Sequence, residues 1–130
     1  MKKVIKNAAL TLLAGVALTA CATKPTTAVQ QTSNQVVLIN TFEVPKGKEQ
    51  AALASWQKSR DFLKTQDGYI STRLHRNLNP NGKFHLINVA VWRSAEDFKK
   101  ATANMRATLK DNAVEGVVFT PDLYQVIESD

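Results

Sequence analysis

The chain has 130 residues and a formal net charge of +6, from 17 basic and 11 acidic side chains. Lys2, Lys3 and Lys6 lie in an N-terminal stretch without acids, so the rest of the chain carries a formal charge of only +3. Its basic residues are spread among acids, which argues against the clustered basic face of a nucleic-acid-binding protein. Cys21 is the only cysteine, so a disulfide within the chain is excluded.

The first 21 residues have the pattern of an export signal. A lysine-rich tip is followed by an apolar run, residues 8–20, in which Thr11 and Thr19 are the only polar side chains. This run is too short to span a bilayer and fits a signal peptide. It ends in Leu-Thr-Ala-Cys, which resembles the bacterial lipoprotein signal. The resemblance implies that residues 1–20 are removed and that Cys21 is acylated, and several acyl chains anchor a protein stably to a membrane.

Residues 21–35 are predicted to connect the anchor to the folded domain. They are rich in Thr and Gln and contain one proline and no aromatic residue. Such a segment cannot bury enough apolar surface to offset its ordering entropy, which predicts a flexible tether before a single domain at 36–130. Ala22 lacks the acidic side chain that holds many lipoproteins at the inner membrane. The resemblance therefore favours the outer membrane, facing the periplasm, and leaves the inner membrane open.

The domain begins with a strand and a helix. Residues 36–44 alternate, and one face carries Val36, Leu38, Asn40, Phe42 and Val44. This period of two, with its β-branched residues, predicts a strand. From residue 48 to residue 65 the apolar spacing becomes helical, which predicts an amphipathic helix that packs Trp56 against a sheet.

The rest of the domain continues as a hairpin, a second helix and a last strand. Strands are predicted at 69–78 and 83–92, joined by residues 79–82, whose proline and glycine favour a tight reversal. Ser94 and Asp97 resemble a capping box that begins a helix ending near residue 110. Alternation over residues 122–128 predicts the final strand.

This βαββαβ order predicts a ferredoxin-like α+β sandwich with both helices on one face of an antiparallel sheet. Both faces of the hairpin strands are largely apolar, and two helices can cover only one of them. An uncovered apolar sheet would exceed the patch that monomers tolerate. We therefore expect a homodimer in which two sheets pack face to face.

Trp56 and three stretches of the domain carry a further resemblance. The stretches are Val-Val-Leu-Ile-Asn-Thr-Phe-Glu-Val-Pro-Lys-Gly-Lys-Glu from residue 36, Asp-Gly-Tyr-Ile-Ser-Thr-Arg-Leu-His-Arg from residue 67, and Phe-His-Leu-Ile-Asn-Val-Ala-Val-Trp-Arg-Ser-Ala-Glu-Asp-Phe from residue 84. Together they resemble the antibiotic biosynthesis monooxygenase (ABM) family, over residues 36 to about 102 and more loosely over the last strand.

The resemblance implies a dimeric α+β barrel of ferredoxin-like subunits. Several family members oxidise quinols or polyphenols without metal or flavin, and related members degrade haem. Haem-degrading relatives carry an asparagine on the first strand, which Asn40 matches, and a tryptophan and a histidine on the second helix. Residues 95–130 contain neither Trp nor His, and the lack of an axial histidine argues against haem degradation by that route.

A polar strip on the hairpin is the candidate catalytic site. A register inferred from the loop length would place Arg73 opposite Asn88, with His75 on the same strand face. Oxygenation without a cofactor needs a base, a dry pocket and groups that stabilise the reduced oxygen. We therefore expect Asn40, Arg73 and His75 to be catalytic residues.

The same register places Tyr69 opposite Trp92, and we expect these two residues and Asn88 to bind the substrate. A slip of one residue would move every side chain to the other face. Each assignment also has a purely structural interpretation: large apolar groups such as Trp92 are typical of a core, and His75 fits a structural histidine as well as a base.

Neither a metal nor a cofactor is expected. The two histidines, the single cysteine and the scattered acids do not form a converging set of metal ligands. The chain also lacks the Gly-rich loops that bind phosphates.

The leading interpretation is a lipid-anchored ABM-type monooxygenase acting on a small aromatic or quinol-like molecule. The alternative is a lipoprotein of the same fold that binds a ligand or has a structural role without catalysis. The missing tryptophan and histidine on the second helix favour this alternative.

Overall fold

The computed structural model describes residue 15 and residues 34–130. The predicted signal peptide, Cys21 and most of the predicted tether lie outside the described residues. The described domain contains six elements, in the order β1 (Val36–Glu43), α1 (Glu49–Leu63), β2 (Tyr69–Arg76), β3 (Leu86–Trp92), α2 (Ala95–Thr108) and β4 (Val118–Tyr124).

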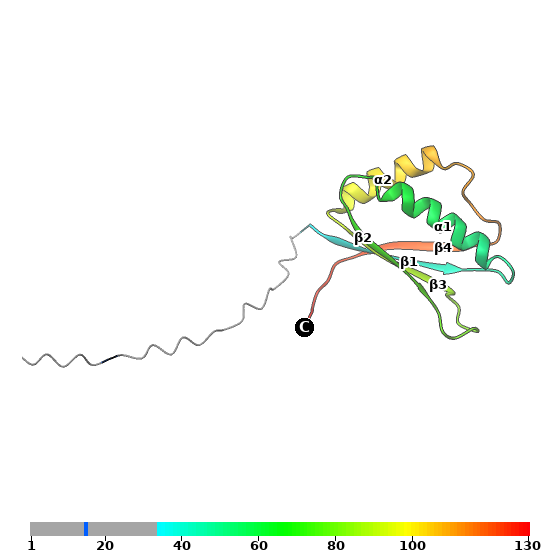
Figure 1. Ribbon diagram of the computed structural model, residues 1–130, viewed down its shortest axis with the longest axis horizontal. Coiled ribbons are helices and arrows are strands. Elements are labelled where there is room, and N and C mark those ends of the chain that lie inside the picture. The colour runs from blue at the N-terminus through cyan, green and yellow to red at the C-terminus, as the bar shows by residue number, and fades with distance from the viewer. Residues whose placement is uncertain (1–14, 16–33) are drawn as a thin grey trace, which may run out of the picture.

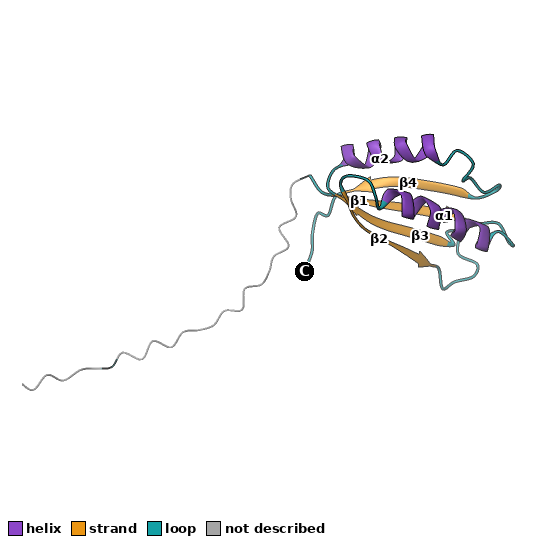
Figure 2. Cartoon of the chain, turned by 45° about the horizontal axis from the view of Figure 1, so that its top comes forward, coloured by secondary structure: helices purple, strands orange, loops and turns teal. Residues whose placement is uncertain are grey.

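The four strands form one sheet in the order β2-β3-β1-β4, and all neighbouring strands are antiparallel. Both helices lie on the same face of this sheet (Figure 1), and the view in Figure 2 shows the same two layers. The predicted ferredoxin-like α+β fold is confirmed. None of the helices within residues 34–130 has the length and apolarity needed to cross a membrane.

The two helices begin where the sequence indicates. Gly47 adopts a positive φ of 84° just before α1, a conformation that glycine adopts without steric cost. At the start of α2, the Ser94 Oγ accepts a hydrogen bond of 3.1 Å from the Asp97 N–H. Hydrogen bonds from Arg93 and Ser94 lower the pKa of the Asp97 carboxyl, so a charged Asp97 ties the end of β3 to the first turn of α2.

Trp92 is the centre of the core between α2 and the sheet. Its side chain is only 1% exposed. Its ring meets Tyr69 edge-on at 5.5 Å and Phe98 at 5.7 Å between centroids. Edge-to-face aromatic contacts of this kind are favourable beyond the area they bury. They fix the start of α2 over the end of β3.

The predicted hairpin register is wrong over most of β2. Tyr69 lies opposite Trp92 as predicted, but the pairing shifts between Tyr69 and Ser71 because β2 contains an irregularity there. Asn88 therefore faces Leu74, and Arg73 faces Val89. Because side chains alternate along a strand, this one-residue shift moves Arg73 to the face opposite Asn88.

The last strand also differs from its prediction, since β4 spans Val118–Tyr124 and not residues 122–128. Its pairing with β1 runs from Val118 opposite Glu43 to Tyr124 opposite Val37. Because β1 begins at Val36, residues beyond 125 have no partner on it. Pro121 is tolerated because β4 is an edge strand, where one side of the backbone needs no partner.

The sheet face away from the helices is apolar at its centre. The register pairs Val37 with Val91 and Ile39 with Val89, and these residues alternate with the helix-facing positions Leu38 and Ala90. Within the described domain, neither helix covers this face (Figures 1 and 2). We call the residues Val37, Ile39, Ile87, Val89 and Val91 the open sheet face.

Candidate functional site

A cavity of about 420 Å³ lies between the two helices and the sheet. We refer to it as the helix–sheet cavity. Its size is within the range of small-molecule sites. Six aromatic side chains line it, from both helices and from all four strands: Phe42, Trp56, Tyr69, Trp92, Phe98 and Phe119. The walls therefore suit a flat aromatic molecule.

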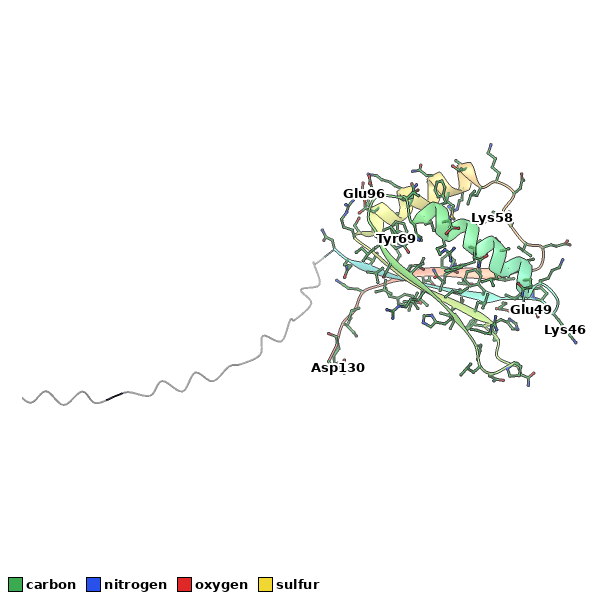
Figure 3. The ribbon with its side chains drawn as sticks, viewed as in Figure 1. Lys46, Glu49, Lys58, Tyr69, Glu96 and Asp130 are labelled. Atoms are coloured by element: carbon green, nitrogen blue, oxygen red, sulfur yellow. The ribbon has the colours of Figure 1, made fainter. Side chains whose placement is uncertain are left out.

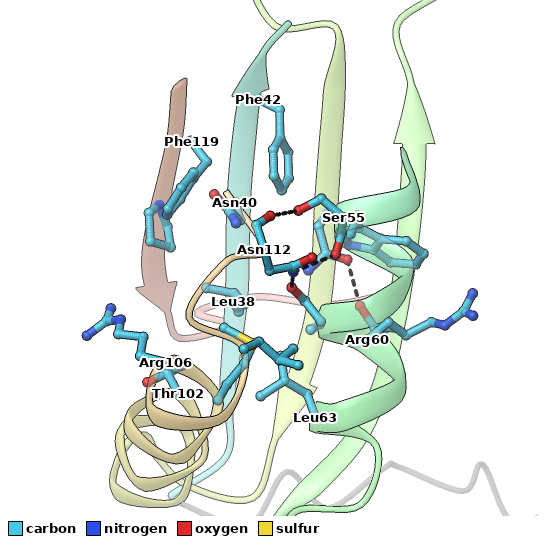
Figure 4. Close-up of a pocket in the computed structure, with 18 of the residues that line it drawn as sticks. Leu38, Asn40, Phe42, Ser55, Arg60, Leu63, Thr102, Arg106, Asn112 and Phe119 are labelled. Atoms are coloured by element: carbon cyan, nitrogen blue, oxygen red, sulfur yellow. Dashed lines mark hydrogen bonds between the residues drawn. The ribbon is translucent and has the colours of Figure 1, made fainter. Parts of the chain in front are cut away.

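Two asparagines form a polar patch on the sheet side of the helix–sheet cavity. Asn40 on β1 lies directly opposite Asn88 on β3, and both side chains line the cavity. Both point toward the helices because they alternate with residues of the open sheet face. The pair thus places two carboxamides side by side beneath the helices (Figure 4 labels Asn40).

The two carboxamides differ in how they are held. Asn88 is only 7% exposed, and its Oδ1 accepts a hydrogen bond of 2.6 Å from the Thr72 hydroxyl. Because this bond occupies the Oδ1 of Asn88, its Nδ2 group is the one directed to a bound molecule, and Nδ2 can only donate. The Oδ1 of Asn40 is buried and accepts no hydrogen bond from any described residue. A buried acceptor without a partner costs stability, and a bound molecule with a donor group would relieve that cost.

Tyr69 and Arg60 lie on the α1 side of the helix–sheet cavity. Tyr69 is the first residue of β2 and lies near the start of α2, where Figure 3 labels Glu96. Burial raises the pKa of the Tyr69 phenol, and the positive charge of Arg60 offsets part of that rise. Tyr69 is therefore protonated at neutral pH and can donate a hydrogen bond. The Arg60 guanidinium lies 5.3 Å from the Trp56 ring centroid, a cation–π contact.

The loop between α2 and β4 forms part of the wall. Asn112 in this loop donates from Nδ2 to the Ser55 carbonyl at 2.9 Å and to the Ser59 hydroxyl at 2.8 Å. The Ser55 hydroxyl in turn donates to the Asn112 carbonyl. Figure 4 shows these bonds between the loop and α1. They hold the loop against α1 and thereby close one side of the helix–sheet cavity.

The predicted site residues separate into two groups. Asn40, Tyr69, Asn88 and Trp92 line the helix–sheet cavity. Arg73 and His75 do not: they are exposed on the opposite face, with Arg73 opposite Val89 and His75 opposite Ile87. Their catalytic roles rested on a register that the structure does not have. The roles of all six residues remain predictions.

Several cavity residues were not identified from the sequence. Thr72 lies on a predicted strand, but the wrong register hid its contact with Asn88. Asn112 lies in a loop whose path no pattern predicts. Phe119 was missed because β4 was placed four residues too late. Pro121 lies between two apolar stretches, and proline within a strand indicates an edge strand. This signal could have placed the start of the last strand before residue 122.

The described lining of the helix–sheet cavity offers hydrogen-bond donors and acceptors but no carboxylate or imidazole that could act as a general base. No Asp, Glu or His is among the described residues that line it. Within residue 15 and residues 34–130, no three His, Cys, Asp or Glu side chains come together as metal ligands. The described site can therefore stabilise a negatively charged molecule with amide and phenol donors, whereas its own side chains supply no carboxylate or imidazole to create that charge.

Replacing Asn112 with alanine should lower the free energy of unfolding by about 1–3 kcal/mol, because two side-chain hydrogen bonds between the loop and α1 are lost. Ser59→Ala, which removes one of them, should cost about half as much. Asn81→Ala in the exposed hairpin loop is the control and should change stability by less than about 0.5 kcal/mol. Urea unfolding followed by tryptophan fluorescence gives these values. An Asn112→Ala protein as stable as the control would contradict the proposed role of the loop contacts.

Comparison with solved structures supports the fold and adds a sequence relationship. A protein of Shewanella loihica PV-4, provisionally described as a monooxygenase, is 43% identical over 75% of this chain and 99% of its own, with a TM-score of 0.69. SnoaB, a cofactor-independent oxygenase of Streptomyces nogalater, is 19% identical over 75% of this chain and 97% of its own, with a TM-score of 0.63. At that identity the likeness shows the fold alone.

A haem-degrading protein of Mycobacterium tuberculosis has the same fold, with a TM-score of 0.51 and 18% identity over 74% of this chain and 98% of its own. No match is found among curated protein sequences. The profile of the antibiotic biosynthesis monooxygenase family matches residues 35–107, more than half of the chain. With the 43% identity to the Shewanella protein, this match shows that the chain belongs to the antibiotic biosynthesis monooxygenase family.

Proposed function

We propose that this protein is a monooxygenase that needs no cofactor and acts on a small aromatic, quinol-like molecule in the helix–sheet cavity. The observation that carries the proposal is the pair Asn40 and Asn88, two carboxamides on the sheet side of a cavity with six aromatic residues in its walls. Family membership and the oxygenase activity of SnoaB, a protein of the same fold, support the reaction class.

Such a reaction takes all its electrons from the organic substrate. The substrate loses two hydrogen atoms and gains one oxygen atom from O₂, and the second oxygen atom leaves as water. The first step is loss of a proton, since the resulting anion is electron-rich enough to reduce O₂. Donation from the Nδ2 groups of Asn40 and Asn88 would stabilise that anion, whereas the unpaired Oδ1 of Asn40 would accept from a donor elsewhere on the substrate. A cavity with little water strengthens both interactions.

The lack of a carboxylate or imidazole in the cavity restricts the substrate. Tyr69 cannot take the proton, because burial raises the pKa of its phenol and keeps it protonated at neutral pH. The proton must therefore leave to water, which is feasible only for a substrate whose own hydroxyl or activated methylene is already acidic. Amide donors lower the pKa of the bound substrate further by binding its anion more tightly than its neutral form.

Oxygen uptake with a panel of hydroquinones tests this proposal. Asn40→Leu keeps the approximate size of the side chain but removes its hydrogen bonds, and should reduce kcat about 10²-fold if the amide acts on the developing anion. His75→Ala is the matched control, because His75 lies on the opposite face, and should stay within about twofold of wild type. Loss of uptake in His75→Ala but not in Asn40→Leu would contradict this location of the site.

The second candidate is a ligand-binding protein without catalysis. Two observations favour it: the described lining residues include no Asp, Glu or His, and residues 95–130 contain neither Trp nor His. If hydroquinones bind with saturation but uptake never exceeds that of buffer, this candidate replaces the first.

We also propose that two copies of the chain pack through the open sheet face. The support is the apolar surface formed by Val37, Ile39, Ile87, Val89 and Val91, because a contiguous surface of this kind normally marks an interface. Val89→Glu should convert the dimer to a monomer in light scattering, because it places a charge at the centre of that surface. Leu78→Glu, at a position already 97% exposed, should remain a dimer. A wild-type protein that is monomeric at micromolar concentration would exclude the interface.

We further propose that the protein is a lipoprotein attached through Cys21 and located at the outer membrane, facing the periplasm. The support is the sequence of the first 22 residues. Cys21→Ser should abolish fatty-acid labelling and release the protein from the membrane fraction. A Cys21→Ser protein that is still labelled by fatty acid and still found in the membrane fraction would refute acylation at Cys21. Separate fractionation of the outer and inner membranes decides in which of the two the wild-type protein is located.

A further inference from the structure

The strand register aligns four residues in one row across the sheet. Arg73 on β2 lies opposite Val89 on β3. Val89 lies opposite Ile39 on β1, which in turn lies opposite Asp122 on β4. Directly paired residues project from the same side of a sheet, so all four side chains lie on the side away from the helices. The open sheet face therefore has a cation at one edge and an anion at the other.

Neither of these charges is neutralised within the described domain. Arg73 and Asp122 are both exposed, and neither takes part in an ion pair within that domain. They lie on the two outer strands, about 14 Å apart across the sheet, which is too far for a direct ion pair within one chain. Glu43, on the same side of the sheet, pairs with Lys83 at 3.6 Å. The charges of Arg73 and Asp122 are thus available to a second molecule.

The row is complementary to its own reversed copy. Two sheets packed face to face can be related by a twofold axis parallel to the strands, which reverses the strand order. Arg73 then faces the partner's Asp122, and Val89 faces the partner's Ile39. A twofold axis across the strands would instead place each strand over its own copy. Arg73 would then face the partner's Arg73, and the like charges would oppose that arrangement.

The two flanking rows agree with the axis parallel to the strands. One row ends in Ser71 on β2 and Tyr124 on β4, and the other ends in His75 and Thr120. When each row lies over its reversed copy, Ser71 faces the partner's Tyr124 and His75 faces the partner's Thr120. All four side chains have a polar group that can form a hydrogen bond. Complementary groups therefore meet at both edges, on either side of the open sheet face.

We propose that two copies pack with β2 of each subunit over the partner subunit's β4, so that Arg73 forms an ion pair with the partner's Asp122. Sheets aligned in this way pack about 10 Å apart, with their strands about 30° from parallel, a separation that a long arginine side chain can bridge. Twofold symmetry makes the ion pair occur twice in the dimer. This inference rests on the proposed dimer and adds its orientation, which the apolar surface alone does not determine.

Reversal of the charges tests this orientation. All proteins are the full-length chain with Cys21→Ser, the parent protein, so that acyl chains cannot hold copies together. Arg73→Asp or Asp122→Arg alone should raise the dissociation constant of the dimer about tenfold or more, because two attractive contacts become repulsive. The variant with both substitutions restores opposite charges and should bind within about threefold of the parent protein. Sedimentation velocity over a dilution series gives the constants, and high salt should reduce the differences.

Two further measurements separate pairing from effects on folding. Arg76→Asp is the matched control, because it makes the same change of charge on β2 at an exposed position opposite Leu86, on the other side of the sheet. It should change the dissociation constant by less than about twofold. An equal mixture of the Arg73→Asp and Asp122→Arg proteins should form heterodimers, because each contact then joins opposite charges.

The outcomes separate the orientation from the interface itself. If the parent protein is a dimer and the single variants dimerise as tightly, the orientation is wrong and the apolar interface stands. Single variants that dimerise weakly and are restored neither by the second substitution nor by mixing would also overturn it, because the residues would then act within one chain. A parent protein that is monomeric at micromolar concentration excludes the interface and the orientation together.

Discussion

The antiparallel pairing of β1 with β3 determines which side chains reach the helices. Because residues alternate along each strand, the register that places Asn40 opposite Asn88 beneath the helices also places Ile39 and Val89 on the open face. A polar pair inside and an apolar surface outside are therefore two results of one register. A slip of β1 by a single residue would turn Ile39 beneath the helices and move Asn40 to the open sheet face.

The cavity exists because the core occupies only one end of the helix layer. Trp92, Tyr69 and Phe98 fill the space where β3 leads into α2. At the other end, Asn112 holds the loop after α2 against α1 and leaves a space of about 420 Å³. The result is a largely apolar cavity whose sheet side carries the carboxamides of Asn40 and Asn88.

Much of the fold is readable from the sequence, because the periods of β1, α1, α2 and the hairpin are set by residues that must be buried. The register of β2 is not readable, since the irregularity after Tyr69 leaves no mark in the pattern. The resulting shift of one residue places His75 and Arg73 on the sheet face opposite to Asn88. The position of Asn112 is equally hidden, because its partners on α1 are more than 50 residues away in the chain.

The central claim is that Asn40 and Asn88 contact a bound aromatic molecule. Its most direct test is an anaerobic titration with 1,4-naphthohydroquinone, observed through the side-chain amide signals of the asparagines by NMR. The account predicts saturable shifts of the Asn40 and Asn88 signals, with the ring signals of His75 unchanged. Shifts confined to His75 and the open sheet face, with both asparagine signals unmoved, would contradict it.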